Sequence, residues 1–307
     1  MDVNQYWQLV NEYDEFKKLD YAPLIDTVTA YQNSAAIMEQ ADAGNVISDL
    51  EQITQLLNGQ NLKNLGQSYE DKIRKFEVEF LQHSYKHYDE VMKFYTVDNV
   101  VKYYDNIDIR KEVQEVINGK IGGAINWQYP GMELSPGANL FTDKLVGLDP
   151  LYIVDKHKKI LARTKESFSP AYQQRLRTYR MGGDADFRAL PQGQMGLIFS
   201  FGFFERLPLD IIKIYMREFW NLLRPGGKVI MTYNNCLLKS SLNITIFHNY
   251  RLFNTKEYVE PVVYGMGFDN IVSTDISANI TVLEFQKPGE LVTQRAGQTL
   301  GKIQKTY

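Results

Sequence analysis

Cysteines, histidines and long apolar runs are scarce in this sequence of 307 residues. The single cysteine, Cys236, excludes an intramolecular disulfide and a zinc site built from several thiolates. No uncharged apolar run approaches the roughly 18 residues that a membrane-spanning helix needs. The first residues also lack the basic and apolar regions of a signal peptide. We therefore expect a soluble protein with no membrane partner, in a reducing compartment such as the cytoplasm.

Two of the four histidines, His83 and His87, are separated by one helical turn. Histidines at this spacing can bind a metal ion on one face of a helix. No glutamate follows His83, however, and no third ligand is evident. The sequence therefore predicts surface or interhelical histidines and no metal site.

The net charge of −3 hides a division along the chain. Residues 1–120 carry 21 acidic and 12 basic residues, whereas residues 121–307 carry 16 and 22. Much of the basic excess lies in residues 156–188. Such a segment can attract phosphates or an acidic partner, form a solvated surface, or complement the acidic half of its own chain. No nucleic-acid-binding module accompanies the charge, so nucleic acid is not the partner we predict.

Residues 1–120 are expected to form an all-α N-terminal domain. Apolar residues recur at helical spacing in residues 46–57, and a longer helix fits residues 67–95. Turns are expected at Asn58-Gly59, Gly66 and Gly119. Residues 97–104 and 109–117 predict two further short helices.

Residues 121–287 alternate between strand-like and helix-like segments, which indicates a parallel sheet covered by helices. We predict an α/β fold with seven strands and helices on both faces, followed by a basic, weakly helical tail at residues 288–307. The expected strands are residues 132–135, 151–155, 176–181, 197–201, 228–233, 271–274 and 280–285, and a turn at residues 224–227 leads into the fifth. The expected helices are residues 140–145, 156–166, 210–223 and 256–266.

Four segments carry a family resemblance when they are taken in order. They are Glu-Leu-Ser-Pro-Gly-Ala-Asn at residues 133–139, Asp155 at the end of a strand, Gly-Asp-Ala at residues 183–185 followed by Leu-Pro at 190–191, and residues 197–207 followed by residues 223–232 with their Arg-Pro-Gly-Gly turn. Each match alone is weak, because Pro-Gly-Gly before a strand is common. Together they resemble a class I S-adenosylmethionine-dependent methyltransferase domain, with its Rossmann-like sheet, over residues 130–287.

The resemblance implies S-adenosylmethionine as the cofactor. Gly137 would let the backbone approach the methionine part, and Asp155 would accept hydrogen bonds from the ribose hydroxyls. Each acid can equally be a helix N-cap or an exposed loop charge. The implied cofactor-binding residues are Glu133, Ser135, Gly137, Asp155, Asp184, Asp186, Phe187 and Ser200.

Three positions depart from the family pattern. Methyltransferases usually have glycine at the positions of Ser135 and Asn139, and aspartate at the position of Gly196. Asparagine tolerates a positive φ better than most residues, so Asn139 can preserve the turn. Ser135 adds a side chain that would narrow the methionine side of the pocket.

Catalytic residues are less evident. Many members that act on small molecules resemble Phe-Glu-His where this chain has Phe-Glu-Arg at residues 204–206, so the expected imidazole is missing. Glu205 could act as a general base, Arg206 could hold an anionic acceptor, and Asn234 could contact the acceptor.

Two functions remain open from the sequence. The first is methyl transfer to a small-molecule or protein acceptor, with residues 1–120 as a lid or substrate domain. The second is a catalytically inactive methyltransferase-like module that contacts a protein partner or another copy of itself through residues 1–120. Residues 144–155 and 287–289 also resemble methyltransferase-like proteins of tailed phages of cyanobacteria, which would place the protein in a host cytoplasm or a virion.

Overall fold

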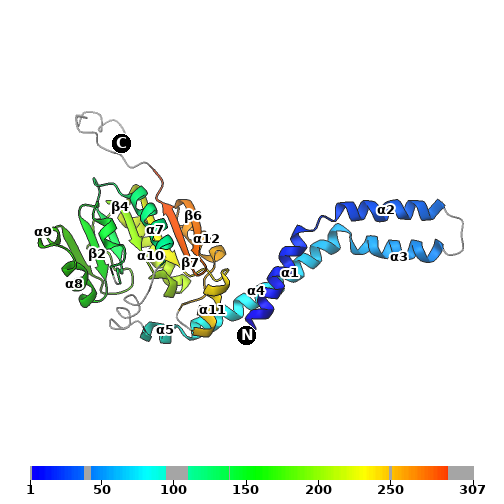
Figure 1. The fold of residues 1–307 in the computed structure, drawn as a ribbon, viewed down its shortest axis with the longest axis horizontal. Coiled ribbons are helices and arrows are strands. Elements are labelled where there is room, and N and C mark those ends of the chain that lie inside the picture. Colours follow the sequence, from blue (N-terminus) through cyan, green and yellow to red (C-terminus); the bar gives the residue numbers. More distant parts are fainter. Residues whose placement is uncertain (1, 38–42, 95–109, 138, 249–250, 290–307) are drawn as a thin grey trace, which may run out of the picture. The chain divides into compact units, whose positions relative to one another are not determined.

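The computed structural model describes residues 2–37, 43–94, 110–137, 139–248 and 251–289 (Figure 1). The chain divides into two compact units, Met1–Gln82 and His83–Tyr307. This division falls within a long helix and not at residue 120, where the sequence led us to expect a domain boundary.

Helices form the described part of the first unit. Tyr6 of α1 is buried and meets the edges of Phe76 and Phe80 of α4, with ring centroids 6.2 and 5.3 Å away. Tyr13 donates a hydrogen bond of 2.5 Å to the Glu70 carboxylate. The helices are α1 (Val3–Lys18), α2 (Ala22–Ile37), α3 (Ala43–Leu56) and α4 (Gly59–Lys86).

The α4 helix corrects two expectations. Gly66 lies within α4 and makes no turn, because the aromatic face of this helix packs along α1 and outweighs the roughly 1 kcal/mol that a helical glycine costs. The helix expected over residues 67–95 is instead two helices, α4 and α5 (Tyr88–Phe94). The break at Asn58-Gly59 is confirmed, and the helix expected at residues 97–104 lies outside the described residues.

The second unit is built on a seven-stranded sheet in the order β3-β2-β1-β4-β5-β7-β6. Strands β1 to β5 pair in parallel, whereas β7 runs antiparallel to both β5 and β6. The parallel strands therefore present their carboxyl ends along one edge. The strands are β1 (Gly131–Leu134), β2 (Leu151–Asp155), β3 (Leu176–Arg180), β4 (Met195–Ser200), β5 (Leu223–Tyr233), β6 (Asp269–Ser277) and β7 (Ile280–Gln286).

Helices cover both faces of this sheet, as predicted. Alternate side chains of β4 lie on opposite faces of the sheet. Ile198 packs in the cluster with α10 and α12, whereas Leu197 and Phe199 pack in the cluster with α7 and α8. The helices are α7 (Lys111–Ala124), α8 (Lys158–Glu166), α9 (Pro170–Gln173), α10 (Leu209–Leu222), α11 (Lys239–His248) and α12 (Lys256–Gly265), with two short 3-10 helices, η1 (Thr142–Leu145) and η2 (Phe204–Arg206).

The α7 helix is longer than predicted. It continues through Gly119, where a turn was expected, because Ile117 and Ile121 on either side are buried against the sheet. Residues 111–120 therefore belong to the second unit and not to an N-terminal helical domain.

Three other local expectations were wrong in part. Residues 140–145 contain a single 3-10 turn in place of a helix. The Arg-Pro-Gly-Gly segment does not precede β5 but forms an irregularity inside it, where Gly226 has a φ of +73°. The helix α11 was missed, because its apolar and polar residues show almost no helical periodicity.

Candidate functional site

The loop after β1 contains only one of the three glycines that are usual in methyltransferases. Its backbone nevertheless adopts the positive φ angles that glycine favours. Ser135, Gly137 and Asn139 have φ values of 55°, 58° and 62°, so every second residue is left-handed. The Ser135 amide donates to the Val154 carbonyl at 2.8 Å, and the Asn139 side-chain oxygen accepts from the Thr164 hydroxyl at 2.5 Å. These bonds offset the strain that a left-handed serine and asparagine cost.

Glu133 is a buried acid at the carboxyl end of β1. Its side chain is almost fully enclosed, and its Oε2 has no hydrogen-bond partner among the described residues. Burial raises the pKa of Glu133 to about 8, against the opposing influence of the Thr142 hydroxyl. An ammonium group could satisfy this oxygen.

Asp155 ends β2 at the same edge of the sheet. It is 2% exposed, and its Oδ1 accepts a hydrogen bond of 2.7 Å from the His157 amide. The same oxygen lies 2.9 Å from His157 Nδ1. The carboxylate is thus fixed in orientation at the end of the strand, with His157 as its partner.

A cavity of about 60 Å³ unites part of the predicted site. Ser135 and Asp155 line it, and so does Arg206 from the turn after β4. Lys156 and His157 were missed, although they directly follow the predicted Asp155, whereas no sequence signal points to Met92 of α5. The lining residues are Met92, Ser135, Asp155, Lys156, His157, Ile160, Met181, Phe203, Arg206 and Leu207.

The residues predicted around an adenine ring each contact a different partner. Asp184 pairs with Lys156 of the cavity wall, and its charge adds to burial in raising the pKa of Tyr88 on α5. Asp186 instead pairs with Arg188 at 2.9 Å, which lowers the pKa of Asp186. Phe187 is completely buried, with its ring centroid 6.1 Å from that of Phe219, so it presents no face to the cavity.

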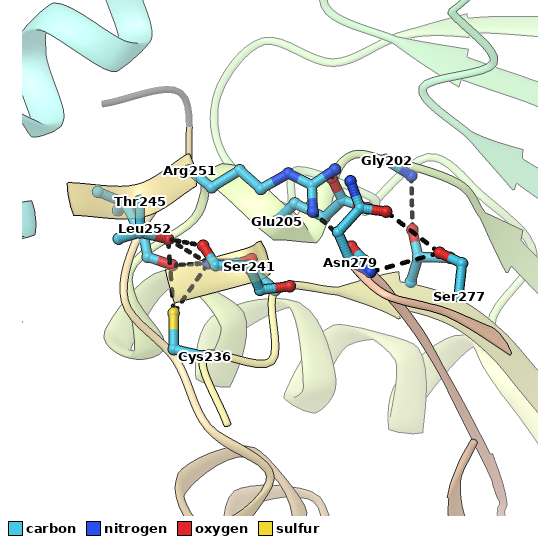
Figure 2. Close-up of polar contacts among 11 residues, drawn as sticks. Gly202, Glu205, Cys236, Ser241, Thr245, Arg251, Leu252, Ser277 and Asn279 are labelled. Carbon is cyan, nitrogen blue, oxygen red and sulfur yellow. Dashed lines mark hydrogen bonds and ion pairs between the residues drawn. The ribbon is translucent and has the colours of Figure 1, made fainter. Parts of the chain in front are cut away.

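Ser200 and two of the candidate catalytic residues are occupied in internal contacts. The Ser200 hydroxyl donates to the Leu134 carbonyl at 3.0 Å. The Glu205 carboxylate pairs with Arg251 at 2.9 Å, and both side chains are less than a tenth exposed. The Asn234 amide donates to the Thr245 hydroxyl at 2.8 Å and to the Leu252 carbonyl at 2.7 Å. In these contacts, shown in part in Figure 2, Glu205 is not available as a general base.

Solved structures provide a comparison for this arrangement. The phosphoethanolamine N-methyltransferase 2 of Haemonchus contortus, in complex with S-adenosyl-L-methionine, matches with a TM-score of 0.51 and 13% identity over 64% of this chain and 58% of that one. A second structure of that enzyme, with phosphomonomethylethanolamine and S-adenosylhomocysteine, matches with a TM-score of 0.50 and 14% identity over the same shares of the two chains. This chain has the class I methyltransferase fold.

The likeness to methyltransferases is one of fold. The match spans 58% of the length of the Haemonchus enzyme. No protein-family model matches this sequence, and no curated protein matches it. Among the described residues, no group of three His, Cys, Asp or Glu side chains could hold a metal ion, and no helix is long and apolar enough to cross a membrane.

Proposed function

We propose that this protein is an S-adenosylmethionine-dependent methyltransferase acting on a small-molecule or protein acceptor. The observation that carries the proposal is that Ser135, one of three left-handed residues in the loop after β1, lines one cavity together with Asp155. Gly137 in this loop has no side chain to obstruct a ligand, and a carboxylate at the end of β2 suits two ribose hydroxyls.

The unpaired oxygen of Glu133 further supports this cofactor, because it is a buried acceptor at the carboxyl end of β1 suited to a ligand's amino group. The bound cofactor would supply an electrophilic methyl group. The chain's own residues would bind and orient it: the loop backbone and Glu133 at the methionine part, Asp155 at the ribose, and Asp184 beside Lys156 near the adenine.

Isothermal titration with S-adenosylhomocysteine and S-adenosylmethionine tests the proposal. The protein is expected to bind both, and Asp155→Asn is expected to weaken each by about tenfold or more, because the amide loses two charge-assisted acceptors. Asp269→Asn, on the exposed edge of β6, is the matched control and should bind as the wild type does. No detectable heat at millimolar ligand would overturn the proposal.

A non-catalytic module is the second candidate, and the buried Glu205–Arg251 pair favours it because it removes the predicted base. Cofactor binding without methyl transfer to any acceptor would be its signature. Association through residues 1–120 and the resemblance of residues 144–155 and 287–289 to phage proteins remain predictions, and with them the cytoplasm or a virion as the location.

A further inference from the structure

The helices α2 and α3 form a hairpin whose apolar side chains are largely uncovered. Figure 1 shows the two helices side by side, and they pack closely against each other. Half of the large apolar side chains that the described residues expose lie in the first unit, although this unit ends at Gln82. Four of them belong to the hairpin: Leu24, Tyr31, Ile53 and Leu56 are 48%, 64%, 40% and 68% exposed.

These exposed side chains lie on the apolar stripe of each helix. A residue advances by about 100° around a helix, so Leu24 and Tyr31 lie within about 20° of each other and the buried Val28 lies about 40° from Leu24. On α3, Ile53 and Leu56 are about 60° apart. Part of each stripe is therefore buried in the hairpin, and the rest is exposed to solvent.

Two short helices cannot bury such stripes by themselves. The helix α2 has 16 residues and α3 has 14. Helices of this length gain most of their stability from packing an apolar face against other elements. A four-helix bundle supplies that packing, because two antiparallel hairpins cover each other's apolar faces.

The hairpin lacks the positive charges that two common classes of partner require. Between Lys18 and Lys63 the sequence contains no lysine, arginine or histidine. A nucleic acid is bound through cationic side chains that neutralise its phosphates, and an anionic membrane attracts lysine and arginine on the polar face of a helix. The exposed stripes therefore suit the apolar face of a protein.

Acidic side chains are also few on these two helices. Asp26 and Glu51 each lie two residues from an exposed apolar side chain, so they fall on the far side of the helix from Leu24 and Ile53. Asp49, four residues before Ile53, is the one acid of the helix α3 on the side of the stripe. A face with so little charge can pack against its own copy without strong repulsion, and it gives a charged partner little to pair with.

We propose that α2 and α3 bind the same hairpin of a second copy of this chain, forming a four-helix bundle in a twofold-symmetric dimer. A twofold axis brings the same face of both copies together, so one self-complementary face is sufficient. The hairpin face is about 24 Å long and about 20 Å wide, given 1.5 Å of rise per residue and two helix diameters. This size is on the order of the ~800 Å² that each partner buries in a specific complex. The proposal locates the association predicted for residues 1–120 in one hairpin, and it does not depend on cofactor binding.

Light scattering after size-exclusion chromatography of the full chain tests the proposal. At tens of micromolar the wild type is expected to have twice the mass of one chain. Tyr31→Glu and Leu56→Glu should each run as a monomer, with association weakened about a hundredfold or more, because the dimer would bury unpaired carboxylates in an apolar interface. Both side chains are mostly exposed in the single chain, so neither change should unfold the hairpin.

Asn33→Glu and Gln55→Glu are the matched controls. They add the same charge to the same helices at exposed positions about 180° from Leu24 and about 200° from Ile53, so both should stay dimeric. Far-ultraviolet circular dichroism compares the helix content of all variants. If a glutamate variant loses helix, Tyr31→Gln or Leu56→Gln replaces it, and the same shift toward monomer is expected because apolar area is lost without a new charge.

A wild-type monomer at these concentrations would overturn the proposal. A dimer that persists in both stripe variants would also overturn it, because its interface would then lie outside the hairpin stripes. Dissociation of the control variants to the same extent as the stripe variants would count equally against it, since the loss would then not depend on the apolar face.

Discussion

Gly196 stands where methyltransferases usually carry an aspartate, and local packing explains why a side chain is absent. A Cβ at this position would lie 2.9 Å from the Cβ of Tyr129, closer than such atoms approach in proteins. Tyr129 is in turn covered by Arg224, whose guanidinium lies 3.5 Å from the ring centroid. The missing aspartate thus reflects a tyrosine packed at the start of β4.

Ser135 holds a strained backbone conformation that glycine would adopt without cost. We expect Ser135→Gly to raise the free energy of unfolding by about 1 kcal/mol, since a left-handed residue with a side chain costs about 1–2 kcal/mol and glycine's extra freedom in the unfolded chain offsets part of the gain. Asn139→Gly should gain less, because it also loses the bond from Thr164. Urea unfolding measures both variants, and a Ser135→Gly protein less stable than the wild type would contradict the prediction.

At the scale of elements, α5 limits the space for a ligand. The cavity beneath Met92 has a volume of about 60 Å³, whereas ligand pockets typically span about 300–1,000 Å³. An adenosyl cofactor bound in this cavity would therefore meet the Met92 side chain.

Met92→Ala should bind S-adenosylhomocysteine several-fold more tightly than the wild type, because less packed side chain has to be displaced. Lys93→Ala, at an exposed position of the same helix, controls for changes in helix propensity. Calorimetric titration compares the three proteins. Weaker binding by Met92→Ala would show that Met92 contacts the ligand and does not obstruct it.

The buried segment of residues 251–255 joins several elements at the carboxyl edge of the sheet. Arg251 pairs with Glu205, the Phe253 amide donates to the Ser84 hydroxyl at 3.1 Å, and the Asn254 side chain donates to the Leu207 carbonyl at 3.1 Å. We expect Arg251→Met to lower the free energy of unfolding by about 3–5 kcal/mol, because it leaves Glu205 buried without its cation.

Arg175→Met is the control for this loss. Arg175 pairs with Asp149 at 2.8 Å, but both side chains are half exposed, so the variant should lose much less stability than Arg251→Met does. Chemical unfolding gives both values. Equal losses in the two variants would mean that burial does not distinguish the two pairs.

At the scale of the whole molecule, Glu133 links stability to pH. The pKa of its carboxyl is about 8 in the folded protein against an ordinary value of 4.5. Between these values only the folded state keeps the proton, so the free energy of unfolding falls as pH rises, by at most about 1.4 kcal/mol per pH unit. Below pH 4.5 the contribution is fully present, and above pH 8 it is lost.

Glu133→Gln removes this dependence. Relative to the variant, the wild type should lose on the order of 2–4 kcal/mol between pH 5 and pH 8. Urea unfolding of both proteins across this range measures the difference. Parallel pH profiles would show that the carboxyl is not held protonated by the fold.

The sequence predicted the larger features of the molecule. Alternation of strand and helix patterns and the ordered motifs indicated a seven-stranded methyltransferase sheet, and strands such as β2 were placed to the residue. These features depend on local periodicity and on turn residues, which neighbouring positions encode. Gly66 and Gly119 were misread as turns because the packing that keeps them helical comes from residues distant in the chain.

The features of the candidate site also divide into those that the sequence predicted and those that depend on the tertiary structure. The sequence by itself determined that residues 133–139 and Asp155 end adjacent strands, and that two glycines of the usual loop are missing. Only the tertiary structure decided that Ser135 and Asn139 keep the left-handed backbone, that Glu205 is bound by Arg251, and that Arg206 and Met92 enclose the cavity. The reason is physical: a backbone angle, a buried charge and a cavity depend on contacts between segments far apart in the sequence, which local residue patterns do not encode.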